Sequence, residues 1–168
     1  GTDSDTIDLS GLTGPVTVTY TGDEAGTITD GTNTITFSNI ENLILTDFDD
    51  VVNGALDGAG LNIDAGAGND TITGGSNRDS IVGGEGDDSI FGGDGVDTLD
   101  GGIGNDTIDG GESTDFINGG DGDDLLVDTG GNLSDDTITG GAGNDTIAGG
   151  AREDLLDGGA DEDTFLIE

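Results

Sequence analysis

Aspartates recur at a nearly constant spacing from about residue 64 to the C-terminal end of the chain. Eleven of them occupy the sixth position of a nine-residue unit, namely Asp70, Asp79, Asp88, Asp97, Asp106, Asp115, Asp124, Asp136, Asp145, Asp154 and Asp163. Carboxylate oxygens are hard ligands, and calcium accepts roughly six to eight such oxygens in flexible geometry. With only two basic residues in the chain to offset such a row, the chain is either disordered or neutralised by external cations.

The other positions of the unit predict how these carboxylates are held. In "GGEGDDSIF" (83–91) and "GGIGNDTID" (101–109), the first six positions are rich in residues that turn tightly. Positions seven to nine form a short strand in which only the apolar residue at position eight faces inward. Two units then make one 18-residue turn of a right-handed coil, and stacked turns make two parallel sheets. The sequence predicts an all-β fold, a parallel β-roll.

The pattern G-G-x-G-x-D-x-U-x resembles the RTX (repeats-in-toxin, hemolysin-type) calcium-binding family from about Asp64 to Phe165. The resemblance implies a right-handed parallel β-roll with roughly four to eight calcium ions between turns on the same edge. It implies that the position-six aspartates are the main side-chain ligands and that loop carbonyls supply the rest. The glycines expected in these loops are Gly66, Gly68, Gly84, Gly86, Gly102, Gly104, Gly120, Gly122, Gly141 and Gly143.

The two edges of the predicted roll differ in sequence. The loops of Asp70, Asp88, Asp106, Asp124, Asp145 and Asp163 form what we call the first edge, and all but the last keep glycine at position four. The loops of Asp79, Asp97, Asp115, Asp136 and Asp154 form the second edge, where position four is Asn77, Gly95, Ser113, Ser134 and Arg152. Because a lost glycine usually means a changed backbone, we expect an unbroken row of ions on the first edge only.

On the second edge we expect fewer or weaker sites, with Arg78 and Arg152 pairing with stacked carboxylates in place of a metal. The alternative is that asparagine and serine tolerate the same turn and that both edges fill.

Residues 1–48 lack the nine-residue unit. Residues 16–22 and 33–40 alternate apolar and polar side chains, which predicts strands or hairpins. We interpret 1–48 as an N-terminal β cap or the end of a preceding module, and 49–168 as the calcium-binding β-roll. The spacing of Leu43, Val52 and Ile63 suggests that degenerate turns begin before the motif. Asp47, Asp49 and Asp50 either ligate a first calcium or form a solvated acidic turn.

Composition excludes several functions. The chain has 38 acidic and 2 basic residues, a formal charge of −36, and neither Cys nor His. This charge disfavours nucleic acid and anionic membranes as partners. Without Cys or His, nucleophilic triads, zinc sites and disulfides are excluded, and the repeat accounts for every acidic pair. We therefore expect no catalysis, and a polysaccharide-acting β-helix enzyme or an ice-binding solenoid with a flat threonine ladder fits less well.

Only about one residue in nine of the repeats is reliably buried, which is too little to offset backbone ordering of roughly 1–2 kcal/mol per residue. We expect the metal-free chain to be disordered and calcium binding to supply folding energy. The family resemblance implies a secreted bacterial protein, exported by type I secretion machinery and located outside the cell or at its surface. The alternative is a structural, adhesive or surface-layer module; no oligomeric state is predicted.

Overall fold

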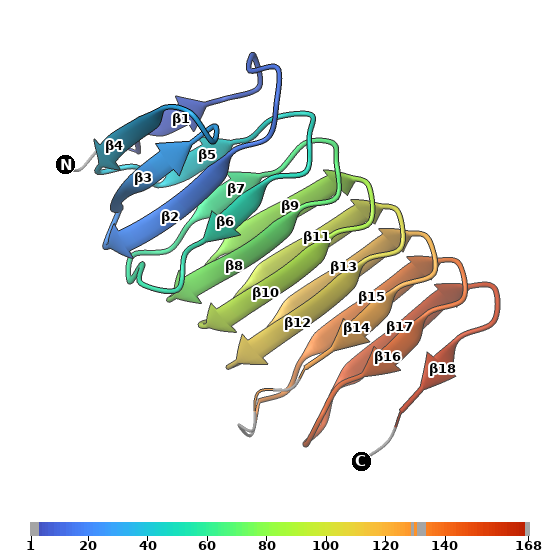
Figure 1. The fold of residues 1–168 in the computed structure, drawn as a ribbon. Coiled ribbons are helices and arrows are strands. Elements are labelled where there is room, and N and C mark those ends of the chain that lie inside the picture. The colour runs from blue at the N-terminus through green and yellow to red at the C-terminus, as the bar shows by residue number, and fades with distance from the viewer. Residues whose placement is uncertain (1–3, 129, 131–133, 167–168) are drawn as a thin grey trace.

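The computed structural model describes residues 4–128, 130 and 134–166, and every regular element in this part is a β-strand (Figure 1). The strands form two sheets. The eight-stranded sheet contains, in spatial order, β1 (Thr6–Asp8), β5 (Asn42–Ile44), β7 (Asn62–Asp64), β9 (Ser80–Glu85), β11 (Thr98–Ile103), β13 (Phe116–Asp121), β15 (Thr137–Ala142) and β17 (Leu155–Ala160). The ten-stranded sheet contains β4 (Thr34–Ser38), β3 (Ala25–Thr29), β2 (Thr17–Gly22), β6 (Val51–Asn53), β8 (Thr71–Ser76), β10 (Ser89–Asp94), β12 (Thr107–Glu112), β14 (Leu125–Val127), β16 (Thr146–Ala148) and β18 (Thr164–Phe165).

From β5 onward, successive strands alternate between the two sheets and pair in parallel with the strand two places further along the chain. In the eight-stranded sheet, Ile81 pairs with Leu99 and Leu99 with Ile117, a spacing of 18 residues. The same register recurs in the ten-stranded sheet, where Ile90 lies between Ile72 and Ile108. One turn of the coil therefore takes two nine-residue units, and the predicted parallel β-roll is confirmed.

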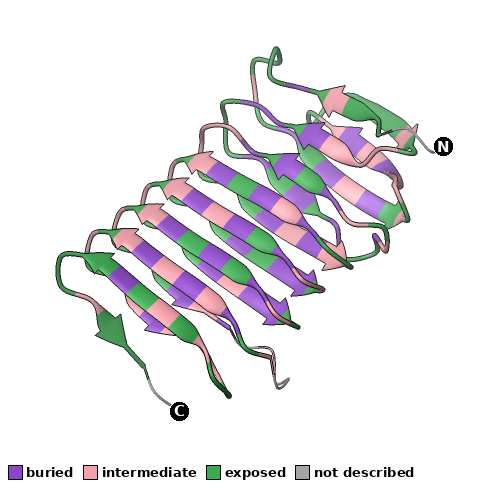
Figure 2. Cartoon of the chain, turned by 180° about the vertical axis from the view of Figure 1, so that it is seen from behind, coloured by how far each residue is buried: buried purple, intermediate pink, exposed green. Residues whose placement is uncertain are grey.

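The core consists of two columns of apolar side chains, one from each sheet. Position-eight residues are fully or almost fully buried along the repeats, namely Ile72, Ile81, Ile90, Leu99, Ile108, Ile117, Leu126, Ile138 and Ile147. Figure 2 shows the resulting pattern, in which buried and more exposed residues alternate along each strand. Because each short strand buries one side chain of this kind, the core is only two side chains thick.

Most repeat strands are longer than the three residues predicted, whereas β14 and β16 have three residues each. Strand β9 and its neighbours extend over six residues, because the glycine pair that opens the next unit continues the ladder. The first glycine of the pair faces inward: a Cβ added at Gly83 would overlap Oδ2 of Asp88 and the carbonyl oxygen of Gly101. Position one therefore requires glycine because the position-six carboxylate lies against it.

The N-terminal residues belong to both sheets. Strands β2, β3 and β4 form the two predicted antiparallel hairpins at one end of the ten-stranded sheet, which is the blue end in Figure 1. Strand β1 pairs in parallel with β5, and β2 pairs in parallel with β6. Leu43, Val52 and Ile63 are buried in register with the repeat core, so the expected degenerate turns are present. The division into a cap and a roll at residue 48 stays a prediction.

An aromatic pair closes this end of the core. Tyr20 is buried, its ring lies 5.1 Å from that of Phe37 in an edge-on arrangement, and its hydroxyl donates a hydrogen bond to the carbonyl of Ile40. Bulky side chains thus cover the apolar column where no further turn stacks on it. The described residues include no helix long and apolar enough to cross a membrane.

Candidate metal-binding edges

The topology places the position-six aspartates on two opposite edges. First-edge loops lead from the eight-stranded to the ten-stranded sheet, as Asp88 does between β9 and β10. Second-edge loops lead back, as Asp97 does between β10 and β11. Because parallel strands stack in register, each aspartate lies directly beside its counterpart one turn away. The predicted alternation of loops between two edges is confirmed.

The position-six carboxylates are buried. Asp79, Asp97 and Asp115 have no exposed surface, and Asp70, Asp88, Asp106, Asp124, Asp136 and Asp145 are at most 3% exposed. Asp154 and Asp163, in the last turn, are partly exposed. An ionised carboxylate in such surroundings is costly unless it is paired or hydrogen-bonded.

One oxygen of each of these carboxylates has a partner in the adjacent turn. Oδ1 of Asp88 accepts the backbone N–H of Asp70 at 2.8 Å, and Oδ1 of Asp97 accepts that of Asp79 at 2.8 Å. The same bond recurs along both edges at 2.8–3.1 Å. The result is a carboxylate ladder on each edge, in which every aspartate ties its own turn to the one before it.

The second oxygen is the atom that tests whether a cation fits. Oδ2 is buried without a hydrogen-bond partner in Asp70, Asp88, Asp97, Asp106, Asp115, Asp124 and Asp145. Leaving a buried acceptor unsatisfied costs about 1–3 kcal/mol, and more when the group is charged. A hard cation beside these atoms removes that cost. The orphaned oxygens therefore fit an oxygen-coordinated metal, and they occur on both edges.

Burial also disturbs the acidity of these groups. Desolvation, assisted by the charges of neighbouring carboxylates, raises the pKa of Asp70 to about 7 and that of Asp115 to about 8. Desolvation likewise raises the pKa of Asp88, Asp97 and Asp124 to about 6. Ionising these carboxyls in the metal-free roll therefore costs more than ionising them in water, whereas a bound cation favours the ionised form.

The glycines predicted for the first-edge loops all have positive φ, from 97° at Gly66 to 143° at Gly122. Each stacks on its counterpart: a Cβ added at Gly84 would overlap the carbonyl oxygen of Gly66, and one added at Gly86 that of Gly68. Carbonyl oxygens therefore run in columns along this edge, close to the aspartates. No group of three or more acidic side chains that could hold a metal ion occurs among the residues described, so side chains alone do not make up a ligand set, and these carbonyls are the further oxygens available.

The second edge keeps a positive φ at position four where glycine is lost. Asn77, Ser113 and Arg152 stand there with φ of 71°, 84° and 114°, whereas φ of the first-edge glycines at this position runs from 119° at Gly68 to 143° at Gly122. The sign of φ is therefore kept, and its value is changed most at Asn77 and Ser113. The prediction of fewer or weaker ions on the second edge stays a prediction.

The arginines do not act as predicted. Within the described part of the chain, neither Arg78 nor Arg152 forms an ion pair with a carboxylate. The charge of Arg78 lowers the pKa of Asp97, but desolvation outweighs it and the net shift of that pKa is upward.

The first edge carries a second ladder at position five. Oδ1 of Asp49 accepts the N–H of Asn69, and the same bond then links each residue to the next through Asp87, Asn105, Asp123, Asn144 and Glu162, at 2.7–3.2 Å. Carboxylates and amides alternate along it, and Asn144 also donates its Nδ2 to Asp123 at 3.0 Å. This ladder uses no orphaned atom.

Two buried aspartates were missed by the repeat pattern. Asp128 is 6% exposed, its Oδ1 has no partner, and desolvation raises its pKa to about 7. It stands nine residues after Gly119, where the pattern would place glycine, and this substitution is the signal that could have revealed it. Asp57, 1% exposed, lies in the loop between β6 and β7, where no repeat unit marks it.

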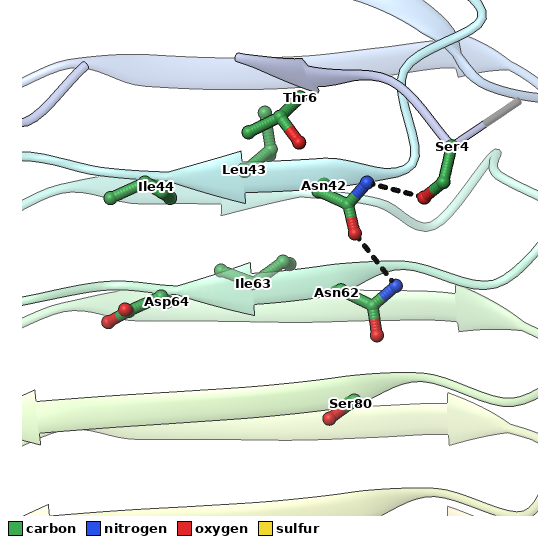
Figure 3. A pocket seen from close by; sticks show the side chains of 9 residues that line it. All are labelled: Ser4, Thr6, Asn42, Leu43, Ile44, Asn62, Ile63, Asp64 and Ser80. Atoms are coloured by element: carbon green, nitrogen blue, oxygen red, sulfur yellow. Dashed lines mark hydrogen bonds between the residues drawn. The ribbon is translucent and has the colours of Figure 1, made fainter. Parts of the chain in front are cut away.

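A surface groove lies elsewhere, on the outer face of the eight-stranded sheet near the N-terminal end (Figure 3). Asn42 donates its Nδ2 to Ser4 Oγ, and Asn62 donates its Nδ2 to Asn42 Oδ1, so the amides of the groove largely bond to one another. Asp64 is the one acidic residue among the described residues that line it. The groove therefore offers neither an acid–base pair nor a position-six carboxylate.

Taken together, the fold and its edges define a class: a parallel β-roll whose stacked glycine–aspartate turns present buried oxygen ligands to cations. Among models of known families, the RTX calcium-binding nonapeptide repeat (4 copies) matches residues 62–90, 91–126 and 130–165. These segments make up more than half of the 168 residues, and the chain belongs to this family. Its repeats are calcium-binding repeats. A comparison with curated proteins finds no match.

Proposed function

We propose that the protein is a calcium-driven folding module, in which the position-six aspartates and the loop carbonyls of adjacent turns bind several calcium ions. The observation that carries this proposal is the set of buried Oδ2 atoms without a partner, repeated at the same place in successive turns. A cation at each of these places neutralises the carboxylates and satisfies the orphaned oxygens together. Bound calcium supplies only charge and coordination, with no redox or acid–base chemistry of its own.

The same atoms explain why folding depends on the ion. In the roll, Asp88 and Asp106 lie buried in adjacent turns, and the charge of Asp106 adds to the cost of ionising Asp88. In the unfolded chain, both are separate and fully solvated. Folding without a cation thus concentrates charge, whereas binding a cation converts the same carboxylates into links between turns. The binding free energy becomes folding free energy.

Folding that depends on calcium suits a protein that is exported from the cell. Extracellular calcium modules bind their ions at about 10⁻⁴–10⁻³ M, so a chain of this kind stays unfolded where free calcium is scarce and folds where it is abundant. We infer a secreted protein that passes type I secretion machinery unfolded and folds outside the cell or at its surface. In this account the array is not an enzyme; it stabilises or presents the protein that carries it.

Exposed apolar residues give little support to a purely adhesive alternative. Phe116 is flanked in its sheet by Thr98 and Thr137, and Val82 by Asp64 and Asp100. Isolated apolar side chains of this kind are normal on protein surfaces. Along these columns, no continuous apolar strip forms.

The proposal is tested by far-UV circular dichroism of the metal-free chain during calcium titration. We expect a cooperative gain of β signal near millimolar calcium that magnesium does not reproduce, because magnesium demands a stricter octahedral geometry. Asp106→Asn should raise the calcium midpoint at least severalfold. The control Asp94→Asn removes an exposed charge of the same type and should leave the midpoint nearly unchanged. Full β signal in chelator, or equal midpoints for the two variants, would contradict the proposal.

A further inference from the structure

The buried carboxylates fall into two groups according to what their second oxygen contacts. Asp88 represents the first group: its Oδ1 accepts the N–H of Asp70, and its Oδ2 has no partner. In the second group, which comprises Asp50, Asp57 and Asp79, backbone N–H groups satisfy both oxygens. These three lie at the N-terminal end of the roll. The difference concerns one atom per residue, and it separates turns that call for a cation from turns that do not.

Asp50 shows how a protein group takes the place of a cation. It occupies the first-edge turn before Val52, two residues ahead of that core residue, as Asp70 stands before Ile72. Its Oδ1 accepts the N–H of Val16 at 2.7 Å, and its Oδ2 accepts the N–H of Thr46 at 2.8 Å. The Thr46 hydroxyl adds bonds of 3.0 and 2.9 Å to the two oxygens. Thr46 is itself fully buried, so these donors fill the space beside the carboxylate.

Asp57 and Asp79 are satisfied in the same way on the second edge. Oδ1 of Asp57 accepts the N–H of Glu24 at 2.6 Å, which ties the hairpin of β2 and β3 to the following turn. Its Oδ2 accepts two N–H groups, from Ala59 at 3.0 Å and Gly60 at 3.1 Å. Oδ2 of Asp79 accepts the N–H of Gly75 at 2.7 Å. Backbone N–H groups point their positive ends at these oxygens and cannot rotate away, so they oppose a cation there.

Asp136, a repeat carboxylate further along the chain, has a weaker substitute for a cation. Oδ2 of Asp136 accepts a bond from the hydroxyl of Ser134 at 3.2 Å. A hydroxyl can rotate and present its own oxygen to a cation, which a backbone N–H cannot do. Asp136 therefore does not join the N-terminal group.

Apolar burial follows the same division. Of the 20 buried hydrophobic residues in the described part, 11 precede residue 66, from Leu9 to Ala65, and 9 follow it. The N-terminal part is the shorter of the two, so it buries far more apolar surface for each residue that it orders. It also contains the aromatic pair of Tyr20 and Phe37. Hydrophobic burial can support this part where the repeats depend on ions.

We propose that strands β1–β7, residues 6–64, form a metal-independent end of the roll, on which the calcium-dependent turns assemble in order, from Asp70 on the first edge and from Asp97 on the second. This inference rests on the proposed function, because it takes calcium-dependent folding of the repeats as given. It places the start of the ion array at the turn of Asp70, the first whose Oδ2 is orphaned. The Asp50 turn, which sequence alone left open as a calcium site, is held by Thr46 and Val16 instead.

The test is hydrogen–deuterium exchange with mass spectrometry on the whole 168-residue chain, in chelator and in calcium. We expect β2, β3, β5 and β6 to be protected in both conditions, and β10–β15 only in calcium. If the whole chain is unprotected in chelator and protected in calcium, the proposed function stands and this inference is wrong. Equal protection of β10–β15 in both conditions would overturn the proposed function and this inference with it.

Thr46→Val sharpens the test, because it removes the hydroxyl with little change of shape. We expect protection of β5 and β6 in chelator to fall about tenfold, as loss of a buried hydrogen bond predicts. The matched control Thr107→Val alters an exposed strand threonine and should leave these strands unchanged. If both variants keep full protection of β5 and β6, Thr46 does not hold the Asp50 turn and the inference fails at its main contact.

Discussion

The two edges of the roll solve the same geometric problem with different side chains. On both edges, the position-six aspartates form a ladder, and Oδ2 is orphaned in repeat turns of each. The first edge adds the position-five ladder of alternating carboxylates and amides, which the second edge replaces with Arg78, Val96, Thr114, Asp135 and Glu153. The comparison separates two roles: carboxylates at position six call for a cation, whereas side chains at position five link turns without one.

Position four has a positive φ on both edges, but the value of φ differs where glycine is lost. Gly104 on the first edge has φ of 137°, and Ser113 on the second has φ of 84°. Residues other than glycine rarely adopt the φ of Gly104. In addition, a Cβ at Gly104 would overlap the carbonyl oxygen of Gly86. Gly104 therefore tolerates less change than Ser113, and Gly95, the one second-edge glycine at position four, is packed as closely, with φ of 141° and a Cβ that would overlap the carbonyl oxygen of Asn77.

The largest effect is expected from exchanging these position-four residues. Gly104→Ser should destabilise the calcium-loaded roll by about 3 kcal/mol, because it combines a strained φ with overlap against a backbone atom. Ser113→Gly should change stability by no more than about 1 kcal/mol, since the turn already has positive φ. Urea unfolding in saturating calcium measures both. Similar losses in the two variants would show that the edges are packed alike.

An intermediate effect is expected from pH in the absence of metal. The pKa values of Asp88 and Asp124 on the first edge are raised to about 6, and that of Asp115 on the second edge to about 8. A carboxyl whose pKa is raised by folding stabilises the fold fully below its unfolded pKa, near 4, and loses this contribution as pH rises through the folded value. In chelator, the β signal should therefore be greatest near pH 4 and fall as pH rises toward 8.

Circular dichroism of dilute protein in chelator measures this loss, and Asp115→Asn removes the group with the highest of these pKa values. Asparagine stays neutral, so the part of the loss between about pH 6 and pH 8 should shrink, while the part at lower pH remains. A β signal that increases with pH in chelator would contradict the assigned direction of these shifts.

The smallest effect is expected at position five. Asn105→Asp would place three carboxylates in succession, at 87, 105 and 123, and remove an amide donor from the first-edge ladder. The expected loss is about 0.5–1 kcal/mol at low salt, as for like charges on neighbouring strands, and less at high salt. Thr114→Asp on the second edge serves as the control, because no such ladder exists there. Thermal unfolding in calcium at two ionic strengths compares them.

The sequence predicted those features that depend on the phase of the repeat. Period and register give the apolar residue of each strand and the alternation of loops between edges, because both follow from one unit stacking on the next. The sequence did not predict the individual contacts between turns. Nothing in the sequence around Thr46 or Gly75 indicates that their N–H groups satisfy a carboxylate, and Asn77 and Ser113 do not disclose the positive φ that their neighbours impose.

The N-terminal strands also make contacts that the sequence did not predict. Their alternation predicted the hairpins, but the parallel pairing of β1 with β5 joins segments 36 residues apart and leaves no local signal. The hydrogen bond of Asp57 could not be predicted either, since its partner Glu24 lies on a separate hairpin. Residues without a repeat are positioned by tertiary contacts, and only a structure reveals those.

The central claim is that the orphaned Oδ2 atoms bind calcium. Its most direct test is a crystal structure of the calcium-loaded chain, with anomalous data collected at a wavelength where calcium scatters strongly. We predict calcium peaks at about 2.3–2.6 Å from Oδ2 of Asp88, Asp106 and Asp124 on the first edge, with loop carbonyls completing each shell. No peak should lie beside Asp50 or Asp57. A roll with its calcium ions elsewhere, and these Oδ2 atoms bonded to protein or water, would contradict the account.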